Sequence, residues 1–180
     1  PNHNKCVVTI LNSAFTPPKD YTVHLVVAPT KMNDRYEWFI EKATEIGVTK
    51  ITPIICQNSE RKFIKTERFE KILQSAMKQS LHYYLPKLNE PISFKDFIKQ
   101  KNEGLLLIAH CEETDKKSFA KEIIKDNPIT ILIGPEGDFS SKEIKLAIEN
   151  EFIPVTLGNT RLRTETAALV ACHTIVIQNE

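Results

Sequence analysis

Residues 129–150 read ITILIGPEGDFSSKEIKLAIEN, and the fold class can be predicted from this stretch outward. Ile129 to Ile133 is a short, continuous apolar run, which is typical of a strand buried on both faces. A loop with two glycines follows. Ser140 and Glu143 then have the spacing of a capping box, which marks the start of a helix. The stretch therefore predicts a strand, a loop and a helix in succession, as in parallel α/β sheets.

The same alternation continues on both sides of this stretch. Further apolar runs that predict strands occupy residues 21–28, 51–56, 105–109 and 154–157. Further predicted helices occupy residues 33–46, 66–80, 116–126 and 164–176. Because the apolar runs are continuous rather than alternating and are separated by helices, we expect a mainly parallel sheet with helices on both faces. The predicted fold class is α/β.

The predicted helix at residues 33–46 has two features that the structure can test. Its spacing places Trp38, Phe39, Ala43 and Ile46 on one apolar side. Gly47 follows at the C′ position, where a residue without a side chain adopts positive φ freely. We therefore expect Trp38 on the apolar side and the helix to end at Gly47.

The first 18 residues differ from the rest. Residues 5–11 (KCVVTIL) predict a β-branched strand, and Thr16-Pro17-Pro18 breaks it. A lone strand before a Pro-Pro linker cannot form a fold by itself. We interpret residues 1–18 as the end of a preceding domain and residues 19–180 as the main domain.

Composition excludes several classes of protein. The 180 residues carry a formal net charge of +1, and their 41% hydrophobic and 26% charged residues are close to globular averages. No apolar run is long enough for a membrane span, and the chain does not begin with a secretory leader. The four cysteines are too far apart for a CxxC motif, so we expect reduced, structural cysteines and a cytoplasmic protein. The neighbouring pair His110-Cys111 is not by itself a catalytic dyad.

Two loops near the C-terminus contain three of the five glycines. They read GPEGDFS from Gly134 and LGNTRLRTET from Leu157, and each follows a predicted strand. Ligands of open α/β sheets bind beyond the carboxyl ends of strands, but ordinary strand-to-helix turns would also explain either loop. Neither loop contains a phosphate-binding glycine motif.

The segment Arg161–Thr166 is harder to explain as a turn. Thr164 or Thr166 can cap the final predicted helix, and Glu165 complements its positive end. Arg161 and Arg163 oppose the helix dipole there, which indicates an anionic or acidic ligand.

A basic segment spans residues 58–87, with seven basic and three acidic residues and the aromatic pair Tyr83-Tyr84. Positive charge beside exposed aromatic rings suits contact with the RNA backbone and base stacking. A solvated helix face with i,i+4 pairs, such as Glu67 with Lys71, explains the charge equally well.

Taken together, IGPEGDFS at 133–140 and LGxxRLRTETA at 157–167 resemble the signature of the 16S rRNA (uracil-N3)-methyltransferases. These are S-adenosylmethionine enzymes of the SPOUT superfamily. The resemblance spans about residues 21–178 and includes the stretches APTK at 28–31, EKATEIG at 41–47 and SER at 59–61.

The resemblance implies a C-terminal trefoil knot and a homodimer whose active sites are completed across the interface. It also implies a preceding PUA-like β-barrel, of which residues 5–11 would be the final strand. S-adenosylmethionine would be the cofactor, and its expected neighbours are Leu107, Ile108, Ala109, His110, Ile133, Gly134, Gly137, Leu157, Gly158, Leu162, Thr166 and Ala167. The implied partner is 16S rRNA in the small ribosomal subunit, with no membrane and no metal.

The sequence departs from the family pattern at two positions. Family loops usually read GPEGG, whereas this chain has Asp138, which either caps the following helix together with Ser140 or alters the cofactor contact. His82 stands where a basic residue is common. Neither departure is expected to remove activity.

Methyl transfer to uridine N3 requires removal of the N3 proton, for which a carboxylate base and a guanidinium would serve. We expect Glu165 as the base and Arg163 as the anion stabiliser, with Glu136 as a competing base. Expected RNA contacts are Arg61, Lys62, Lys65, Arg68, Lys78, His82 and Arg161. The alternatives are a SPOUT enzyme that methylates another base or a ribose 2′-oxygen, and an RNA-binding assembly factor without catalysis.

Overall fold

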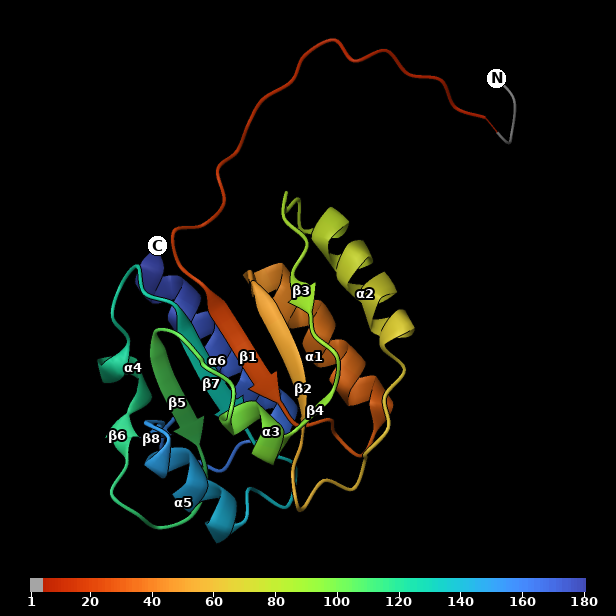
Figure 1. Ribbon diagram of the computed structural model, residues 1–180. Coiled ribbons are helices and arrows are strands. Elements are labelled where there is room, and N and C mark those ends of the chain that lie inside the picture. Colours follow the sequence, from red (N-terminus) through yellow and green to blue (C-terminus); the bar gives the residue numbers. More distant parts are fainter. Residues whose placement is uncertain (1–4) are drawn as a thin grey trace.

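A computed structural model describes residues 5–180, and its centre is one sheet whose strand pairs are all parallel (Figure 1). The strands are β1 (Val23–Val27), β2 (Lys50–Ile55), β3 (Lys87–Leu88), β4 (Ile92–Ser93), β5 (Leu105–Ala109), β6 (Lys117–Ser118), β7 (Ile129–Ile133) and β8 (Ile153–Thr156). Their order is β3-β2-β1-β7-β5-β8-β6, and β4 also pairs with β2. Because the pairing is parallel, the carboxyl ends of all strands lie at one edge.

Helices cover both faces of this sheet. On one face lie α1 (Asn33–Ile46), α2 (Thr66–Gln79) and α6 (Thr164–Asn179); on the other lie α3 (Phe94–Ile98) and α5 (Ser141–Glu149). The short helix α4 (Phe119–Glu122) follows β6 at the edge of the sheet. The arrangement is a three-layer α/β sandwich.

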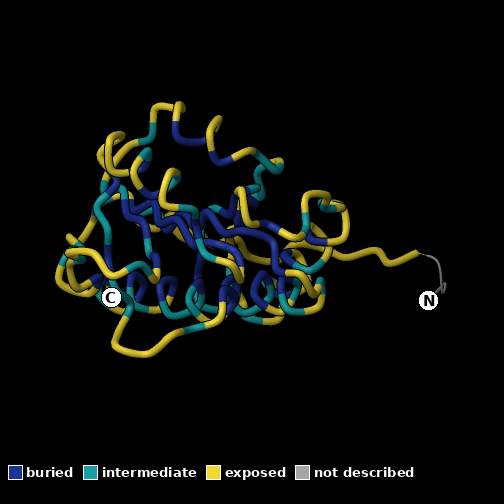
Figure 2. The backbone as a smooth tube through the Cα atoms, turned by 90° about the horizontal axis from the view of Figure 1, so that it is seen from below, coloured by how far each residue is buried: buried dark blue, intermediate teal, exposed yellow. Residues whose placement is uncertain are grey.

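Successive side chains along a strand point to opposite faces of the sheet, so each strand contributes to the hydrophobic cores on both faces. In β1, Leu25 and Val27 pack into the core shared with α1, α2 and α6, whereas Val26 packs into the core shared with α3 and α5. All three side chains are fully buried. Figure 2 shows the resulting buried layer through the middle of the domain. Burial on both faces explains the continuous apolar runs in the sequence.

The predicted fold class is confirmed, and several boundaries agree with the prediction. The strands at 105–109 and 129–133 and the helix at 33–46 have the predicted limits. Gly47 has φ +113° and its N–H donates to the Ala43 carbonyl, so it ends α1 as expected. Ser140 and Glu143 form a full capping box at the start of α5.

Other predictions were wrong. Of the strand predicted at residues 5–11, residues 6–11 form none in the described chain, and residues 1–4 of the predicted remnant lie outside the described part. That residues 1–18 end a preceding domain stays a prediction. The helix predicted at 116–126 shrinks to α4, because Lys117 and Ser118 pair with β8 instead and Asp126 has positive φ. The short elements β3, β4, β6 and α3 have only two to five residues each, and no pattern in the sequence predicted them.

Trp38 also differs from the prediction. Phe39 and Ala43 are fully buried as expected, but the indole of Trp38 remains 47% exposed beside the first turn of α6. The trefoil knot stays a prediction from the family resemblance. Within residues 5–180, no helix combines the length and apolarity that a bilayer crossing requires.

Candidate functional site

The loops that follow β5, β7 and β8 meet at the carboxyl edge of the sheet and enclose a cavity of about 520 Å³. Its apolar wall consists of Ala109, Ile133, Val155, Leu157, Leu162 and Ala167. Its charged wall consists of Glu112, Lys116, Asp138 and Arg161. This volume is within the roughly 300–1,000 Å³ of small-molecule sites, and a mainly apolar lining with a few polar groups is typical of them.

His110 is the buried polar residue of this cavity. Neither ring nitrogen has a hydrogen-bond partner among the described residues, although the side chain is only 7% exposed. Burial lowers the pKa of His110, and the nearby Lys116 ammonium lowers it further. The ring is therefore neutral at neutral pH and offers one donor and one acceptor. Buried polar atoms in native proteins nearly always have partners, so these two atoms point to a bound ligand.

Lys116 fixes the loop that begins with His110. Its ammonium donates to the carbonyl oxygens of His110, at 3.0 Å, and Glu112, at 2.7 Å. These bonds hold the positive charge against the cavity wall. The sequence analysis did not single out Lys116, because the fold alone brings it back onto the strand end.

Asp138 joins two of the three loops. It adopts positive φ, at 60°, which explains why a residue without a side chain is usual at this position. One carboxylate oxygen accepts from the Cys111 N–H at 2.6 Å, and the other accepts from the Phe139 N–H. The helix cap is supplied by Ser140 and Glu143, so of the two interpretations of Asp138, the capping role is wrong.

A second cavity of about 290 Å³ adjoins the first and is lined by Gly134, Pro135, Glu136 and residues 161–164. The Thr164 hydroxyl donates to the Gly134 carbonyl at 3.0 Å and ties the start of α6 to the loop after β7. Because no side chain caps α6, the capping roles expected for Thr164 and Thr166 were wrong. Glu136 is exposed and accepts from the Lys31 N–H at 2.9 Å.

Glu165 lies in the first turn of α6, and its side chain is only 8% exposed. One carboxylate oxygen is 3.9 Å from Nε of Arg35 on α1, and the other has no partner among the described residues. The carboxylate borders an open groove, lined also by Asp34, Trp38, Arg161, Leu162, Arg163 and Thr166. The sequence analysis missed Arg35, because its relation to Glu165 depends on the packing of α1 against α6.

Most of the expected cofactor residues line the two cavities, and four do not. Ala109, His110, Ile133, Leu157, Gly158, Leu162 and Ala167 line the larger cavity, and Gly134 lines the smaller one. Leu107 and Ile108 are buried in the core of β5, and Thr166 faces the groove of Glu165. The carbonyl of Gly137 accepts from the Asn58 amide at 3.0 Å, outside both cavities.

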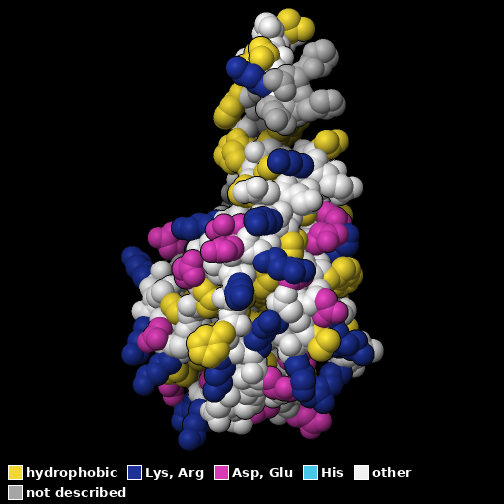
Figure 3. Space-filling model, turned by 90° about the vertical axis from the view of Figure 1, so that its right-hand side faces the viewer, with side chains coloured by type: hydrophobic (Ala, Val, Ile, Leu, Met, Phe, Trp, Pro, Cys, Tyr) yellow, Lys and Arg dark blue, Asp and Glu magenta, His cyan; other side chains and the backbone are white. Residues whose placement is uncertain are grey.

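Of the expected RNA contacts, Arg161 lines the cavities, whereas the others lie outside them. Lys62, Lys65 and Lys78 are exposed, whereas the Arg68 guanidinium pairs with Glu37 at 2.7 Å. His82 is half-buried, with Nε2 3.0 Å from the Glu45 carbonyl oxygen, so it is a structural contact as well. Figure 3 shows basic side chains over the side of the molecule on which α2 lies. In the described part of the chain, no three His, Cys, Asp or Glu side chains gather as a metal site.

Comparisons with known proteins agree with this geometry. Residues 17–176 match the family described as RNA methyltransferase domain. The ribosomal RNA small subunit methyltransferase E of Mesomycoplasma hyopneumoniae is 37% identical over 94% of this chain and 75% of its own length. A probable rRNA methyltransferase from Porphyromonas gingivalis superposes with a TM-score of 0.85 at 40% identity, covering 92% of this chain and 72% of that one.

A third relative was solved with a ligand. The ribosomal RNA small subunit methyltransferase E from Neisseria gonorrhoeae, bound to S-adenosyl methionine, superposes with a TM-score of 0.75 at 30% identity. The match covers 88% of this chain and 67% of that one. These likenesses confirm the expected SPOUT-type fold and the expected family. The chain belongs to the RNA methyltransferase family.

Proposed function

We propose that this chain transfers the methyl group of S-adenosylmethionine to N3 of a uridine in 16S ribosomal RNA of the small subunit. The observation that carries the proposal is the cavity at the carboxyl edge, where the buried His110, without a hydrogen-bond partner among the described residues, faces the loops that form the family motifs. The relatives named for methylation of small-subunit ribosomal RNA support the substrate.

The residues of the larger cavity fit S-adenosylmethionine. The apolar wall suits the flat adenine ring, and the two unpartnered nitrogens of His110 suit its polar edge. Gly158 has φ +147°, and no atom lies within 4 Å of where its Cβ would be, so its backbone can border a ligand closely. When bound, this cofactor supplies an electrophilic methyl group on a sulfonium sulfur.

The residues of this chain then prepare the acceptor. Glu165 removes the N3 proton, since one of its carboxylate oxygens is buried and has no other partner among the described residues. Arg163 stabilises the negative charge that develops on the uracil ring, and Arg161 contacts a phosphate. Glu136 is the weaker candidate for the base, because it is exposed and already accepts a backbone hydrogen bond.

Three further parts of the proposal concern partners and location. Copies of the chain form a homodimer through α6, whose outward residue Ile177 is exposed. Residues 1–18 belong to a preceding PUA-like domain that helps to bind RNA. The protein works in the cytoplasm, which suits its four free cysteines.

The test is to incubate the chain with S-adenosylmethionine and small ribosomal subunits, and to analyse the nucleosides of the ribosomal RNA by mass spectrometry. The expected product is 3-methyluridine. A different methylated base or a 2′-O-methyl nucleoside would replace the proposed reaction with that of a related enzyme. Binding of the cofactor and RNA without any methylated product would indicate an assembly factor.

A further inference from the structure

We infer that the groove between α1 and α6 binds the target uracil itself, with Trp38 stacked on one face of the ring and Glu165 bonded to its imide N–H. The inference rests on the proposed function and specifies where its substrate binds. It adds Trp38 and Arg35 to the residues that the sequence motifs supply.

The groove is lined by an aromatic ring and by guanidinium groups, which together can bind a nucleotide. Trp38 is half exposed, and it borders the groove together with Arg161 and Arg163. Stacking on an aromatic ring is a common way to bind an unpaired base, and guanidinium groups bind the adjoining phosphate. Arg161 and Leu162 also line both cavities, so the groove and the cofactor site share this short segment as a wall.

Glu165 provides the polar contact. The carboxylate is buried, yet one oxygen has no partner in the described chain. A buried carboxylate oxygen without a donor is costly, so a donor from a ligand accounts for it. Uracil presents a donor at N3, whereas cytosine presents an acceptor there. The free oxygen therefore favours uracil over cytosine.

Arg35 is a positioning residue in this arrangement. Its guanidinium is 3.9 Å from the second oxygen of Glu165 and is itself partly exposed. Pairing of that oxygen with Arg35 leaves the other oxygen turned toward the base. The geometry also explains release of the product, because 3-methyluridine no longer has an N–H to donate.

The chain carries a direct reporter of this site, since Trp38 is its only tryptophan. The experiment is to titrate the full chain with single-stranded decauridylate, decacytidylate and deca(3-methyluridylate), and to follow the tryptophan fluorescence. We expect quenching by decauridylate, with affinity about tenfold lower for the other two oligonucleotides. Calorimetric titration with S-adenosylmethionine checks that each sample is folded.

Variants separate the contributions. Trp38→Ala should weaken decauridylate binding about tenfold in fluorescence anisotropy with labelled RNA, and Trp38→Phe should restore most of it. Ile148→Ala is the matched control, because Ile148 is a similarly exposed hydrophobic residue on α5, on the other face of the sheet. Glu165→Leu should abolish the preference for uridine over cytidine. Arg35→Ala should lower kcat more than it raises KM, and Arg35→Lys should recover kcat.

Two outcomes would overturn the inference. The first is normal formation of 3-methyluridine by Trp38→Ala with unchanged RNA affinity, which would leave the proposed function intact and place the base elsewhere. The second is tryptophan emission that changes on dilution of the protein but not on addition of RNA, which would assign the groove to a contact between copies. Failure of the proposed function would be seen separately, as the absence of a methylated product with the unmodified chain.

Discussion

The interior of the sheet and its carboxyl edge each contain a buried histidine, and the two rings differ in their hydrogen bonding. His24 lies in the middle of β1, with Nε2 2.7 Å from the Thr52 hydroxyl and Nδ1 3.3 Å from the Thr130 hydroxyl. His110 lies one residue beyond β5, and neither of its ring nitrogens has a partner in the described chain. Burial lowers the pKa of both side chains.

A buried polar side chain with hydrogen-bond partners in the chain stabilises the fold. One without such partners is suited to bind a ligand. The buried side-chain atoms without partners in the described residues belong to His110 and Glu165, and both residues lie at the carboxyl edge. The interior satisfies its own polar groups, as native cores do. A substitution in the interior should therefore change stability, and one at the edge should change binding or turnover.

The largest expected effect is on turnover. Glu165→Gln removes the proposed base without changing the shape of the side chain, and we expect kcat for 3-methyluridine formation to fall by about 10²–10³. The melting temperature and the affinity for S-adenosylmethionine should stay close to those of the unsubstituted chain. Glu136→Gln is the control, with little expected effect. A parallel loss of stability in Glu165→Gln would place this residue with the interior group.

His24→Ala should have the largest effect on stability. The change removes the ring between Thr52 and Thr130 and its edge contact with Phe97, whose ring centroid is 5.9 Å away. We expect a loss of about 3 kcal/mol in the free energy of unfolding, measured by urea denaturation. A loss below about 1 kcal/mol would contradict the distinction between the two regions.

The sequence predicted the strands of the sheet interior better than the short strands at its edge. Continuous apolar runs identified β5 and β7 to the residue, because burial on both faces leaves a strong local pattern. The two-residue strands β3 and β4 leave no such pattern, since they depend on the neighbouring β2. Residues 6–11 have the composition of a strand, but they pair with no strand in the described part of the chain. An apolar sequence pattern therefore predicts a strand only where the fold also places a neighbouring strand beside it.

The site was predictable only to the extent that residues adjacent in the sequence form it. The motif residues Gly134, Leu162 and Ala167 do line the cavities. The contact of Asp138 with the Cys111 N–H joins loops 27 residues apart, and the pairing of Arg35 with Glu165 joins two helices. Such relations come from the packing of distant segments, so no motif or periodicity indicates them.

Lowering the pH should destabilise the protein through the buried His24. Desolvation, with a smaller effect of Lys50, lowers the pKa of His24 from 6.5 to about 3. The unfolded chain therefore binds a proton between these values while the folded chain does not, so stability falls as the pH falls below 6.5. Between pH 6.5 and 5 we expect His24 to account for a loss of about 2 kcal/mol.

The measurement is the free energy of unfolding at both pH values for the unsubstituted chain and for His24→Ala. The variant should lack this part of the pH dependence, and His110→Ala serves as the control for the second buried histidine. An equal pH dependence with and without His24 would show that its pKa is not lowered in the folded chain.

The smallest expected effect comes from His110. Because its ring makes no hydrogen bond within the described chain, His110→Ala should change the free energy of unfolding by less than about 1 kcal/mol. It should nevertheless weaken binding of S-adenosylmethionine about tenfold, as loss of one hydrogen bond does. Calorimetric titration gives the affinity. Unchanged affinity would remove His110 from the cofactor site.

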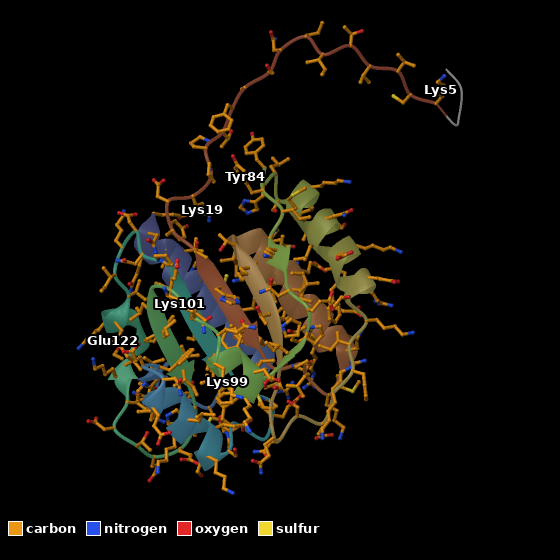
Figure 4. All side chains as sticks on the ribbon, viewed as in Figure 1. Lys5, Lys19, Tyr84, Lys99, Lys101 and Glu122 are labelled. Atoms are coloured by element: carbon orange, nitrogen blue, oxygen red, sulfur yellow. The ribbon has the colours of Figure 1, made fainter. Side chains whose placement is uncertain are left out.

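The extended segment before Lys19 exposes apolar side chains that a neighbouring strand would cover. Figure 4 shows Lys5 far out on this segment and Lys19 where the chain enters the domain. Between them, the side chains of Val7, Val8, Ile10, Leu11 and Phe15 are each at least 79% exposed. An extended, apolar backbone with free hydrogen-bonding groups is a template for strands of other molecules. In the longer protein that we propose, strands of the preceding PUA-like domain would pair with this segment and cover its apolar side chains.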